Sequence, residues 1–229
     1  MSKPVIKIDV VSDVVCPWCY IGKRRLEKAI DELKDRIHFE VEYHPFELNP
    51  DTPKKGFNHK EYLTKKFGSE ERYQQMTNHV VTIAAQEGLK FNFNDQQVSP
   101  NTLDSHRLIA FAKNQGKQQE MKEALMNAYF EKGIDLTQNK NLVSIAEALG
   151  LDGNAVESFL NTEELVAEVK LEEKLNHQRG ISGVPFYIIN NKYSVSGAQP
   201  KEAFLQVFTE VGNEPFGVAE ACDIDTKNC

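Results

Sequence analysis

The chain has 229 residues, of which 40% are hydrophobic and 27% are charged, and its formal net charge is −7. This composition is typical of a globular protein, and the length suits one large domain or one domain that carries an insertion. The negative charge argues against broad binding of nucleic acids or anionic membranes, because no basic surface would dominate the electrostatic field.

The N-terminal residues and the cysteines bear on the cellular compartment. Lys7 and Asp9 interrupt the segment in which an export signal needs an unbroken apolar run, and no apolar stretch is long enough to cross a bilayer. We therefore expect a cytosolic protein, in which paired cysteines indicate redox or metal chemistry because stable structural disulfides are rare there. The four cysteines are Cys16, Cys19, Cys222 and Cys229.

A strand and a helix are predicted at the start of the chain. Residues 5–11 alternate between apolar and polar side chains and end in two valines, which predicts a buried strand. Apolar residues then recur at helical spacing over 26–33. Pro17 suits the first helical position, where its missing N–H costs nothing. Cys16 is therefore predicted to lie at a helix N-terminus, directly after a strand.

The middle of the chain is predicted to be helical. Residues 39–44 alternate again and predict a second strand. From about residue 60 to 177 the apolar spacing predicts four or five helices without strands. Asn161 and Glu164 resemble a capping box that opens the last of these helices.

The end of the chain predicts a hairpin and a helix. Strands are expected over 186–189 and 193–195, with Asn190 and Asn191 as the tight turn between them. A final helix is expected over about 200–211.

This order of elements is the thioredoxin topology with an insertion. We therefore predict an α/β protein, a thioredoxin fold with a large all-helical insertion. Residues 1–50 and 180–212 are expected to form the thioredoxin-like domain, residues 51–179 the helical insertion subdomain, and residues 213–229 a C-terminal tail with a cysteine pair.

The motif Cys16-Pro17-Trp18-Cys19 places two thiols three residues apart. The thiolate is the attacking form, and a helix N-terminus stabilises it through partial positive charge and free N–H groups. Cys19 lies on the same helical face and can attack the mixed disulfide that Cys16 forms. The sequence predicts Cys16 as nucleophile and Cys19 as resolving thiol. Lys23 and Arg24 are candidates for adding positive potential near the thiols, although solvated surface charges are the favoured interpretation.

Half of a zinc site is the alternative interpretation of such a pair. A zinc ribbon needs a second closely spaced pair, whereas Cys222 and Cys229 are separated by six residues and no histidines cluster near either pair. The strand–CxxC–helix context therefore favours redox chemistry without a metal.

A proline far along the chain is the second expected part of the centre. Gly183-Val184-Pro185-Phe186 leads into a predicted strand. In a thioredoxin fold a cis-proline faces the CxxC motif and leaves the preceding backbone free to pair with an extended substrate. We predict a cis bond between Val184 and Pro185 and a substrate-binding role for both.

Four residues have weaker claims. Trp18 either offers an apolar face to substrate or packs under the insertion. His106 and His44 are candidates for tuning the thiolate, although each also fits an ordinary structural histidine. Asp13, three residues before Cys16, fits a local turn cap.

The tail cysteines support two hypotheses. Cys222 and Cys229 are either unrelated thiols or an auxiliary redox pair that exchanges electrons with Cys16 and Cys19. The second hypothesis rests on their closeness in sequence, which makes a disulfide between them easy to close.

Five segments together resemble a known family. They are SDVVCPWCYIGK (12–23), PFELNP (45–50), SHRL (105–108), GISGVPF (180–186) and SGAQ (196–199). In order and spacing they resemble the FrnE-like branch of the DsbA family in the thioredoxin superfamily, over nearly the whole chain.

The resemblance implies disulfide oxidoreductase or isomerase activity in the cytosol, on protein or small thiol and disulfide substrates. The same branch is similar to 2-hydroxychromene-2-carboxylate isomerases and kappa-class glutathione transferases, which use glutathione and typically carry serine at the position of Cys16. Two cysteines therefore favour dithiol exchange over glutathione-assisted isomerisation.

Three functions stay open on the sequence. The leading one is a protein disulfide oxidoreductase or isomerase without a cofactor beyond its redox-active disulfide, with glutathione as a candidate thiol partner. The others are a glutathione-dependent small-molecule isomerase or transferase and a redox-sensing, chaperone-like binding protein. We expect a monomer or homodimer without nucleic-acid or membrane partners.

Overall fold

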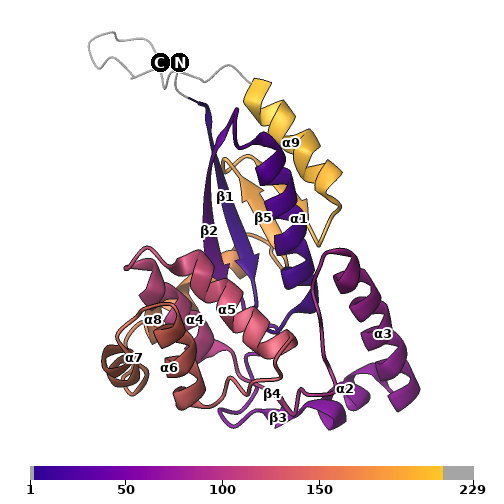
Figure 1. Ribbon diagram of the computed structural model, residues 1–229, viewed down its shortest axis with the longest axis vertical. Coiled ribbons are helices and arrows are strands. Elements are labelled where there is room, and N and C mark those ends of the chain that lie inside the picture. Colours follow the sequence, from indigo (N-terminus) through magenta and orange to yellow (C-terminus); the bar gives the residue numbers. More distant parts are fainter. Residues whose placement is uncertain (1–2, 214–229) are drawn as a thin grey trace.

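The computed structural model describes residues 3–213, and its centre is a four-stranded sheet in the order β2-β1-β5-β6 (Figure 1). The strands are β1 (Val5–Ser12), β2 (His38–Pro45), β5 (Phe186–Ile189) and β6 (Tyr193–Ser196). β1 pairs with β2 in parallel and with β5 antiparallel, and β6 pairs antiparallel with β5. The predicted strand positions are confirmed to within one residue at each end.

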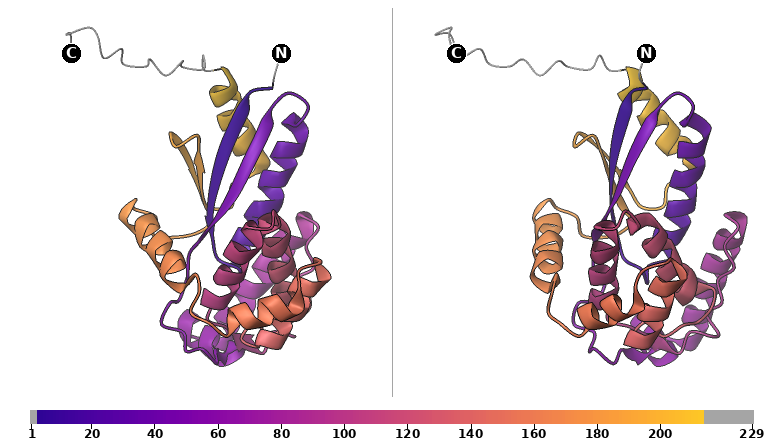
Figure 2. Two further views of the ribbon diagram at one scale, coloured as in Figure 1. Left: turned by 90° about the vertical axis from the view of Figure 1, so that its left-hand side faces the viewer. Right: turned by 60° about the vertical axis from the view of Figure 1, so that its left-hand side comes forward.

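The two faces of the sheet are covered by different helices. Ile6, Ile8 and Val10 of β1 are buried together with residues of α1 (Pro17–Leu33) and α9 (Lys201–Asn213). The opposite face carries Val11, which packs with Phe46 and Ile181 beside α8 (Val166–Gln178). Figure 2 shows the sheet between α8 on one side and α1 with α9 on the other. Ile6, Ile8 and Val10 thus share one face of β1, as a period of two requires. The other face carries the exposed Lys7 and the half-buried Asp9 before it reaches Val11.

The chain between β2 and β5 holds more helices than the spacing predicts. The other helices there are α2 (His59–Phe67), α3 (Glu70–Gln86), α4 (Leu103–Lys113), α5 (Gln118–Phe130), α6 (Asn139–Ala148) and α7 (Gly153–Leu160). Gly68, at a φ of 92°, ends α2 and donates its N–H to the Thr64 carbonyl, so that α2 and α3 are two separate helices. This segment is also not wholly helical.

Two short strands, β3 (Phe57–Asn58) and β4 (Val98–Ser99), pair antiparallel within the predicted insertion. The prediction of an insertion without strands is therefore wrong in this detail. Each strand has two residues, which is too short for an alternating pattern to show in a sequence. The fold class, a thioredoxin-like α/β fold with a large helical insertion, is confirmed.

The predicted capping box at Asn161 and Glu164 is wrong. Asn161 instead ends α7, where its N–H bonds to the Glu157 carbonyl. The N–H of Glu164 bonds to the Thr162 hydroxyl at 3.2 Å, and α8 begins only after Leu165, which has a φ of 62°. A left-handed residue between two helices has no signature in hydrophobic spacing.

The hairpin turn is confirmed. Asn190 and Asn191 have φ values of 50° and 55°, the left-handed conformation that a type I′ turn requires and that asparagine tolerates.

No helix in residues 3–213 combines the length and apolar character that crossing a membrane would require.

Candidate active site

Cys16 and Cys19 lie at the start of α1, which follows the carboxyl end of β1. Figure 1 shows this end of α1 next to the helices between β2 and β5. Cys16 occupies the N-cap position with extended backbone, and Pro17 is in the first turn of the helix. Both Cys16 and Cys19 are buried and present as free thiols. The Cys19 N–H donates to the Cys16 carbonyl at 3.0 Å, so that the first helical turn holds the pair together.

The Val184–Pro185 peptide bond is cis, as the sequence predicts. The Cys16 thiol donates to the Val184 carbonyl at 3.6 Å, across 168 residues of sequence. The Pro185 carbonyl in turn accepts the Gly197 N–H at 2.8 Å. The GISGVPF and SGAQ segments thus meet beside Cys16.

Gly22 allows α1 to approach this loop closely. A Cβ atom on Gly22 would lie 3.1 Å from Cγ of Pro185 and 2.2 Å from the hydroxyl of Tyr187. Because the Tyr187 ring is fully buried, it has no room to withdraw. The glycine therefore fixes the distance between the helix that carries the thiols and the loop that carries the cis-proline.

Asp13 contacts the two remaining segments of the family resemblance, PFELNP through Leu48 and SHRL through His106. Its carboxylate accepts the Leu48 N–H at 2.8 Å and lies 3.4 Å from Nε2 of His106 on α4. Burial raises the pKa of Asp13, but the hydrogen bond and charge of His106, the Leu48 N–H and the charge of Lys122 outweigh it and leave the pKa below its ordinary value. Asp13 is therefore an ionised residue under the redox loop, a larger role than the predicted turn cap.

Lys122 of α5 is a buried cation that the sequence interpretation missed. Its side chain is almost completely inaccessible and donates to the Ser12 carbonyl at 3.1 Å. Burial lowers the pKa of Lys122 to about 8, although the charges of Cys19, Asp13 and Cys16 act in the opposite direction. The sequence did indicate that Lys122 is buried, because Lys122 lies on the same helical stripe as the buried Leu125 and Tyr129.

Burial has the largest effect on the protonation of Cys19. Burial raises the pKa of Cys19 well above its ordinary value, and the adjacent Cys16 raises it further, while the charge of Lys122 lowers it. Cys19 is therefore protonated at neutral pH, which suits a thiol that reacts only after Cys16 has reacted.

The two candidate histidines contact carboxylates rather than the cysteines. The pKa of the buried His106 is lowered by burial, which outweighs the opposing effect of Asp13. His44 lies 2.9 Å from Asp9 and also contacts Glu172 on α8; although burial lowers its pKa, these carboxylates raise it above the ordinary value. Only His106 is connected, through Asp13, to the loop that carries Cys16.

Trp18 is half-buried and its ring lies 6.3 Å from that of His79 on α3. The indole thus lies beside a helix near the redox centre while part of it stays accessible. Both roles considered for Trp18, contact with substrate and packing against this part of the chain, are compatible with this position.

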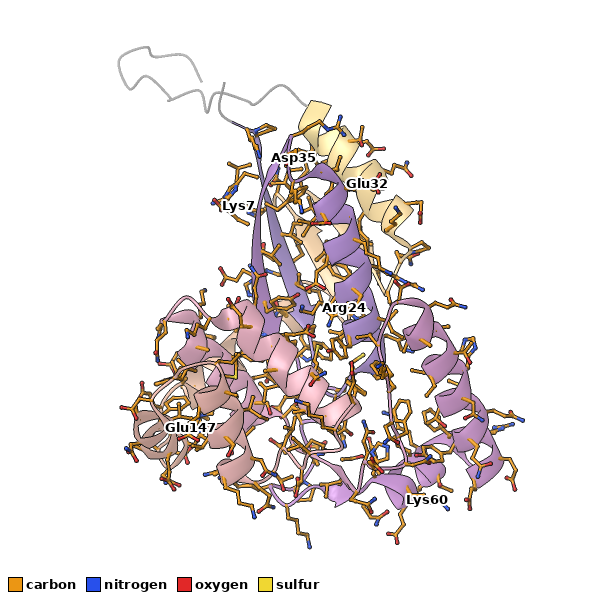
Figure 3. The ribbon with its side chains drawn as sticks, in the orientation of Figure 1. Lys7, Arg24, Glu32, Asp35, Lys60 and Glu147 are labelled. Atoms are coloured by element: carbon orange, nitrogen blue, oxygen red, sulfur yellow. The ribbon has the colours of Figure 1, made fainter. Side chains whose placement is uncertain are left out.

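Lys23 and Arg24 are not the solvated charges that the sequence suggests. Lys23 is 5% exposed and pairs with Glu27 and, at 2.7 Å, with Glu123 of α5. Arg24 also pairs with Glu123 and lies over the Tyr20 ring, and Figure 3 shows it on the lower half of α1. These pairs attach α1 to α5, which the sequence could not show because Glu123 is about one hundred residues away.

Two buried carboxyl groups lie behind the site. Glu47 and Glu173 are 5% and 9% exposed, and within residues 3–213 each has one oxygen without a hydrogen-bond partner. Burial, together with the charge of Asp13, raises the pKa of Glu47 to about 7. Burial and the charge of Glu47 raise the pKa of Glu173 to about 8. The two groups thus favour the protonated state in the folded protein.

Glu173→Gln is expected to stabilise the fold at high pH only. A carboxyl group whose pKa rises on folding costs nothing below its unfolded pKa, near 4.5, and destabilises the fold as the pH rises through its folded pKa. The variant should gain about 2 kcal/mol of unfolding free energy at pH 9 and nothing at pH 4, measured by urea denaturation. Glu168→Gln, on the exposed face of α8, is the control, and an equal gain at both pH values would contradict this assignment.

Comparison with known proteins places the chain among thiol–disulfide enzymes. Residues 7–209 match the model of the DSBA-like thioredoxin domain. The uncharacterized protein YwbO of Bacillus subtilis (strain 168) is 30% identical over 208 residues, which are 90% of this chain and 96% of that protein.

Two solved structures extend the comparison. The probable DsbA oxidoreductase SCO1869 from Streptomyces coelicolor is 34% identical, with a TM-score of 0.85 over 96% of this chain and 97% of that one. The cytosolic disulfide reductase DsbM from Pseudomonas aeruginosa, solved with GSH, shares the fold at 17% identity, with a TM-score of 0.62 over 89% of this chain and 99% of that one. The matched family model, the relatives and the geometry around Cys16 agree, and the chain belongs to the DSBA-like thioredoxin domain family.

Proposed function

We propose that the protein is a dithiol–disulfide oxidoreductase or isomerase that acts on protein disulfides in the cytosol. The observation that carries the proposal is the contact between the Cys16 thiol, at the N-terminus of α1, and the Val184 carbonyl that precedes a cis-proline. Membership in a family of thiol–disulfide enzymes supports the general activity.

The roles of the two cysteines follow from their positions in the helix. Both thiols are equally buried, so exposure does not separate them. Cys16 is at the N-cap, where the unpaired N–H groups and the helix dipole favour a thiolate. Cys19 is one turn further along, and its raised pKa keeps it protonated. Cys16 therefore attacks the substrate disulfide, and Cys19 attacks the resulting mixed disulfide.

The substrate is proposed to bind along the loop before β5. An extended peptide can form main-chain hydrogen bonds with backbone next to a cis-proline, and the half-buried side chains of Val184 and Trp18 supply apolar contact on either side of Cys16. The chemistry requires no cofactor beyond the cysteine pair itself. A small thiol such as glutathione can regenerate the pair by the same exchange.

Cys19→Ser is expected to trap the substrate. With Cys19 replaced, a mixed disulfide on Cys16 cannot be resolved, so that the adduct should accumulate to nearly one equivalent instead of turning over. The variant should also carry Cys222→Ser and Cys229→Ser, which leaves Cys16 as the one thiol. Incubation with insulin and with oxidised glutathione, followed by non-reducing electrophoresis and intact-mass analysis, measures the adducts.

The outcomes separate the functions. Disulfide-linked adducts with insulin chains support exchange on protein disulfides. An adduct with glutathione but not with protein would favour the glutathione-dependent small-molecule enzyme. If neither adduct forms, a redox-sensing binding protein becomes the better assignment, and the proposal is wrong.

A further inference from the structure

A pocket that the redox centre does not use lies between α2, α3 and the segment 91–97. Its volume is about 690 Å³, in the range of sites that enclose a small ligand or a few residues of a peptide. Asparagine and glutamine make up more than half of its polar lining, and the rings of Tyr73, Phe91 and Phe93 supply its aromatic part. Figure 3 shows Lys60, another lining residue, on α2 at the bottom of the view.

Gln96 gives the clearest sign that this pocket takes a ligand. The side chain is 5% exposed, and its Nε2 donates to the Tyr129 carbonyl at 3.1 Å. Since a carbonyl only accepts, this contact fixes the orientation of the amide. The Oε1 of Gln96 is then left without a donor among residues 3–213. A buried acceptor without a donor is unfavourable, so a ligand that supplies an N–H or O–H to Gln96 is favoured.

The aromatic part of the pocket is continuous with the core around the cysteines. The Phe93 ring meets the Phe91 ring edge-on, with centroids 5.9 Å apart, and the Phe91 ring stacks on Tyr20 at 5.8 Å. Tyr20 directly follows Cys19 in the chain. Phe93 is half-buried, so that part of its ring stays accessible. The aromatic part can therefore hold an apolar side chain of a ligand close to the helix that carries the thiols.

α3 extends from the pocket to the redox motif. Its residue His79 lies beside Trp18, with ring centroids 6.3 Å apart, while the adjacent Asn78 lines the pocket. Val81 also lines the pocket and packs against the same apolar cluster as Trp18. Figure 1 shows α3 beside the N-terminal end of α1. A polypeptide bound at Cys16 that continues past Trp18 therefore needs only a few extended residues, at about 3.3 Å each, to reach the pocket.

We propose that this pocket binds an extended segment of the substrate protein while Cys16 attacks the disulfide of that protein. The inference rests on the proposed exchange with protein disulfides and adds a binding site apart from the loop before β5. The ligand is a neutral, extended polypeptide. Its main-chain N–H and C=O groups pair with the amides of the pocket, and one of its apolar side chains lies on the aromatic rings.

The lining matches a polypeptide main chain. A side-chain amide presents a C=O acceptor and N–H donors, as a peptide unit does, so it can pair with a chain of any sequence. Asn78 and Asn94 line the pocket and are exposed, which makes them available for such contacts. Lys60 pairs with Glu70 at 2.5 Å, which leaves little charge to select an ionic ligand. Recognition that does not depend on sequence suits an enzyme whose protein substrates differ in sequence.

The neighbouring glutamines Gln74 and Gln75 of α3 give a matched pair of variants. Both side chains are exposed, but Gln74 lines the pocket and Gln75 does not. Gln74→Trp should fill the pocket with an indole ring, whereas Gln75→Trp places the same ring elsewhere on the helix. The first measurement is kcat/KM for the reduction of insulin and of oxidised glutathione, with the same small dithiol as electron donor. Each glutathione chain spans only about 10 Å when extended, so it can react with Cys16 without filling the pocket.

Gln74→Trp should lower kcat/KM for insulin about tenfold, mainly through KM, because a remote contact adds binding without changing the reacting groups. Its kcat/KM for oxidised glutathione, and both values for Gln75→Trp, should stay within about twofold of the wild-type values. The second measurement is calorimetric binding of insulin B chain whose cysteines are alkylated with iodoacetamide, a peptide that cannot exchange. Its Kd should rise about tenfold in Gln74→Trp and not in Gln75→Trp.

A wild-type kcat/KM for insulin in Gln74→Trp would overturn the inference, as would an equal fall for insulin and for glutathione. If Gln74→Trp does not fold, the double variant Asn78→Ala, Asn94→Ala removes two exposed amides and should raise the Kd of the alkylated chain about threefold; an unchanged Kd would overturn the inference.

Maltotriose, a neutral sugar with many hydroxyl groups, is the competing ligand in the binding measurement. If it displaces the alkylated chain, the pocket is a carbohydrate site and the inference is wrong. Binding of the alkylated chain does not depend on exchange, so the two proposals fail separately. A wild-type protein that binds this chain but exchanges with neither insulin nor glutathione would refute the proposed function and leave the peptide site supported.

Discussion

Cys16→Ser is expected to lower the rate of disulfide exchange by roughly 1,000-fold or more, because a serine hydroxyl is not ionised near neutral pH and cannot form a disulfide. The substitution replaces sulfur with a smaller oxygen that can still donate to the Val184 carbonyl, so that the helix N-terminus and the cis-proline loop should keep their arrangement. The measurement is the rate of insulin disulfide reduction with a small thiol as the electron donor.

The tail cysteines supply the control for this experiment. Cys222 and Cys229 lie outside the described residues, and the hypothesis that they form an auxiliary redox pair stays a prediction. A Cys222→Ser, Cys229→Ser variant should retain turnover if Cys16 is the first thiol to attack. Undiminished turnover in Cys16→Ser would contradict the assignment of Cys16 as nucleophile, whatever the tail does.

The parts of the fold that the sequence predicted are those with a strong local pattern. The alternation in β1 and the helical spacing after Pro17 reflect burial on one face, which a period of two or of 3.6 records directly. The asparagine pair of the hairpin and the cis bond before Pro185 depend on the backbone preferences of single residues. These features place the thiols and the loop opposite them.

The buried charges of the site could not be predicted in the same way. Lys122 lies 110 residues from Ser12, the residue whose carbonyl it contacts, and Glu123 lies about as far from Lys23 and Arg24. The helical stripe of Lys122 indicates that the side chain is buried, but neither that stripe nor the polar helical face of Lys23 indicates which residue is its partner. The contacts become visible only when α5 is packed against α1.

Arg107→Ala is expected to lower the free energy of unfolding by about 3–5 kcal/mol, which is the largest stability effect we predict. Arg107 is 2% exposed and its guanidinium is shared by several acceptors. They are the Glu164 carbonyl at 2.8 Å, the Asp104 carboxylate at 2.7 Å, the Phe159 carbonyl at 3.2 Å and the Thr162 carbonyl at 2.7 Å.

These acceptors explain the size of the effect. The guanidinium connects α4 to the turn between α7 and α8 and also lies 4.8 Å from the centre of the Phe159 ring. Its removal leaves three carbonyl groups and one carboxylate without their donor and opens a cavity in the interior. Since His106 is the adjacent residue on α4, the loss should also disturb the contact between His106 and Asp13.

Urea denaturation of Arg107→Ala, Arg107→Lys and Arg179→Ala measures the effect. Arg107→Lys keeps the charge but cannot reach acceptors in several directions at once, so it should recover less than half of the lost stability. Arg179→Ala removes an exposed arginine at the end of α8 and should change the unfolding free energy by no more than about 0.5 kcal/mol. If Arg107→Lys is as stable as the wild-type protein, the positive charge alone accounts for the contribution of Arg107 to the free energy of unfolding. In that case the fork of hydrogen bonds between α4 and the α7–α8 turn does not hold the helices together.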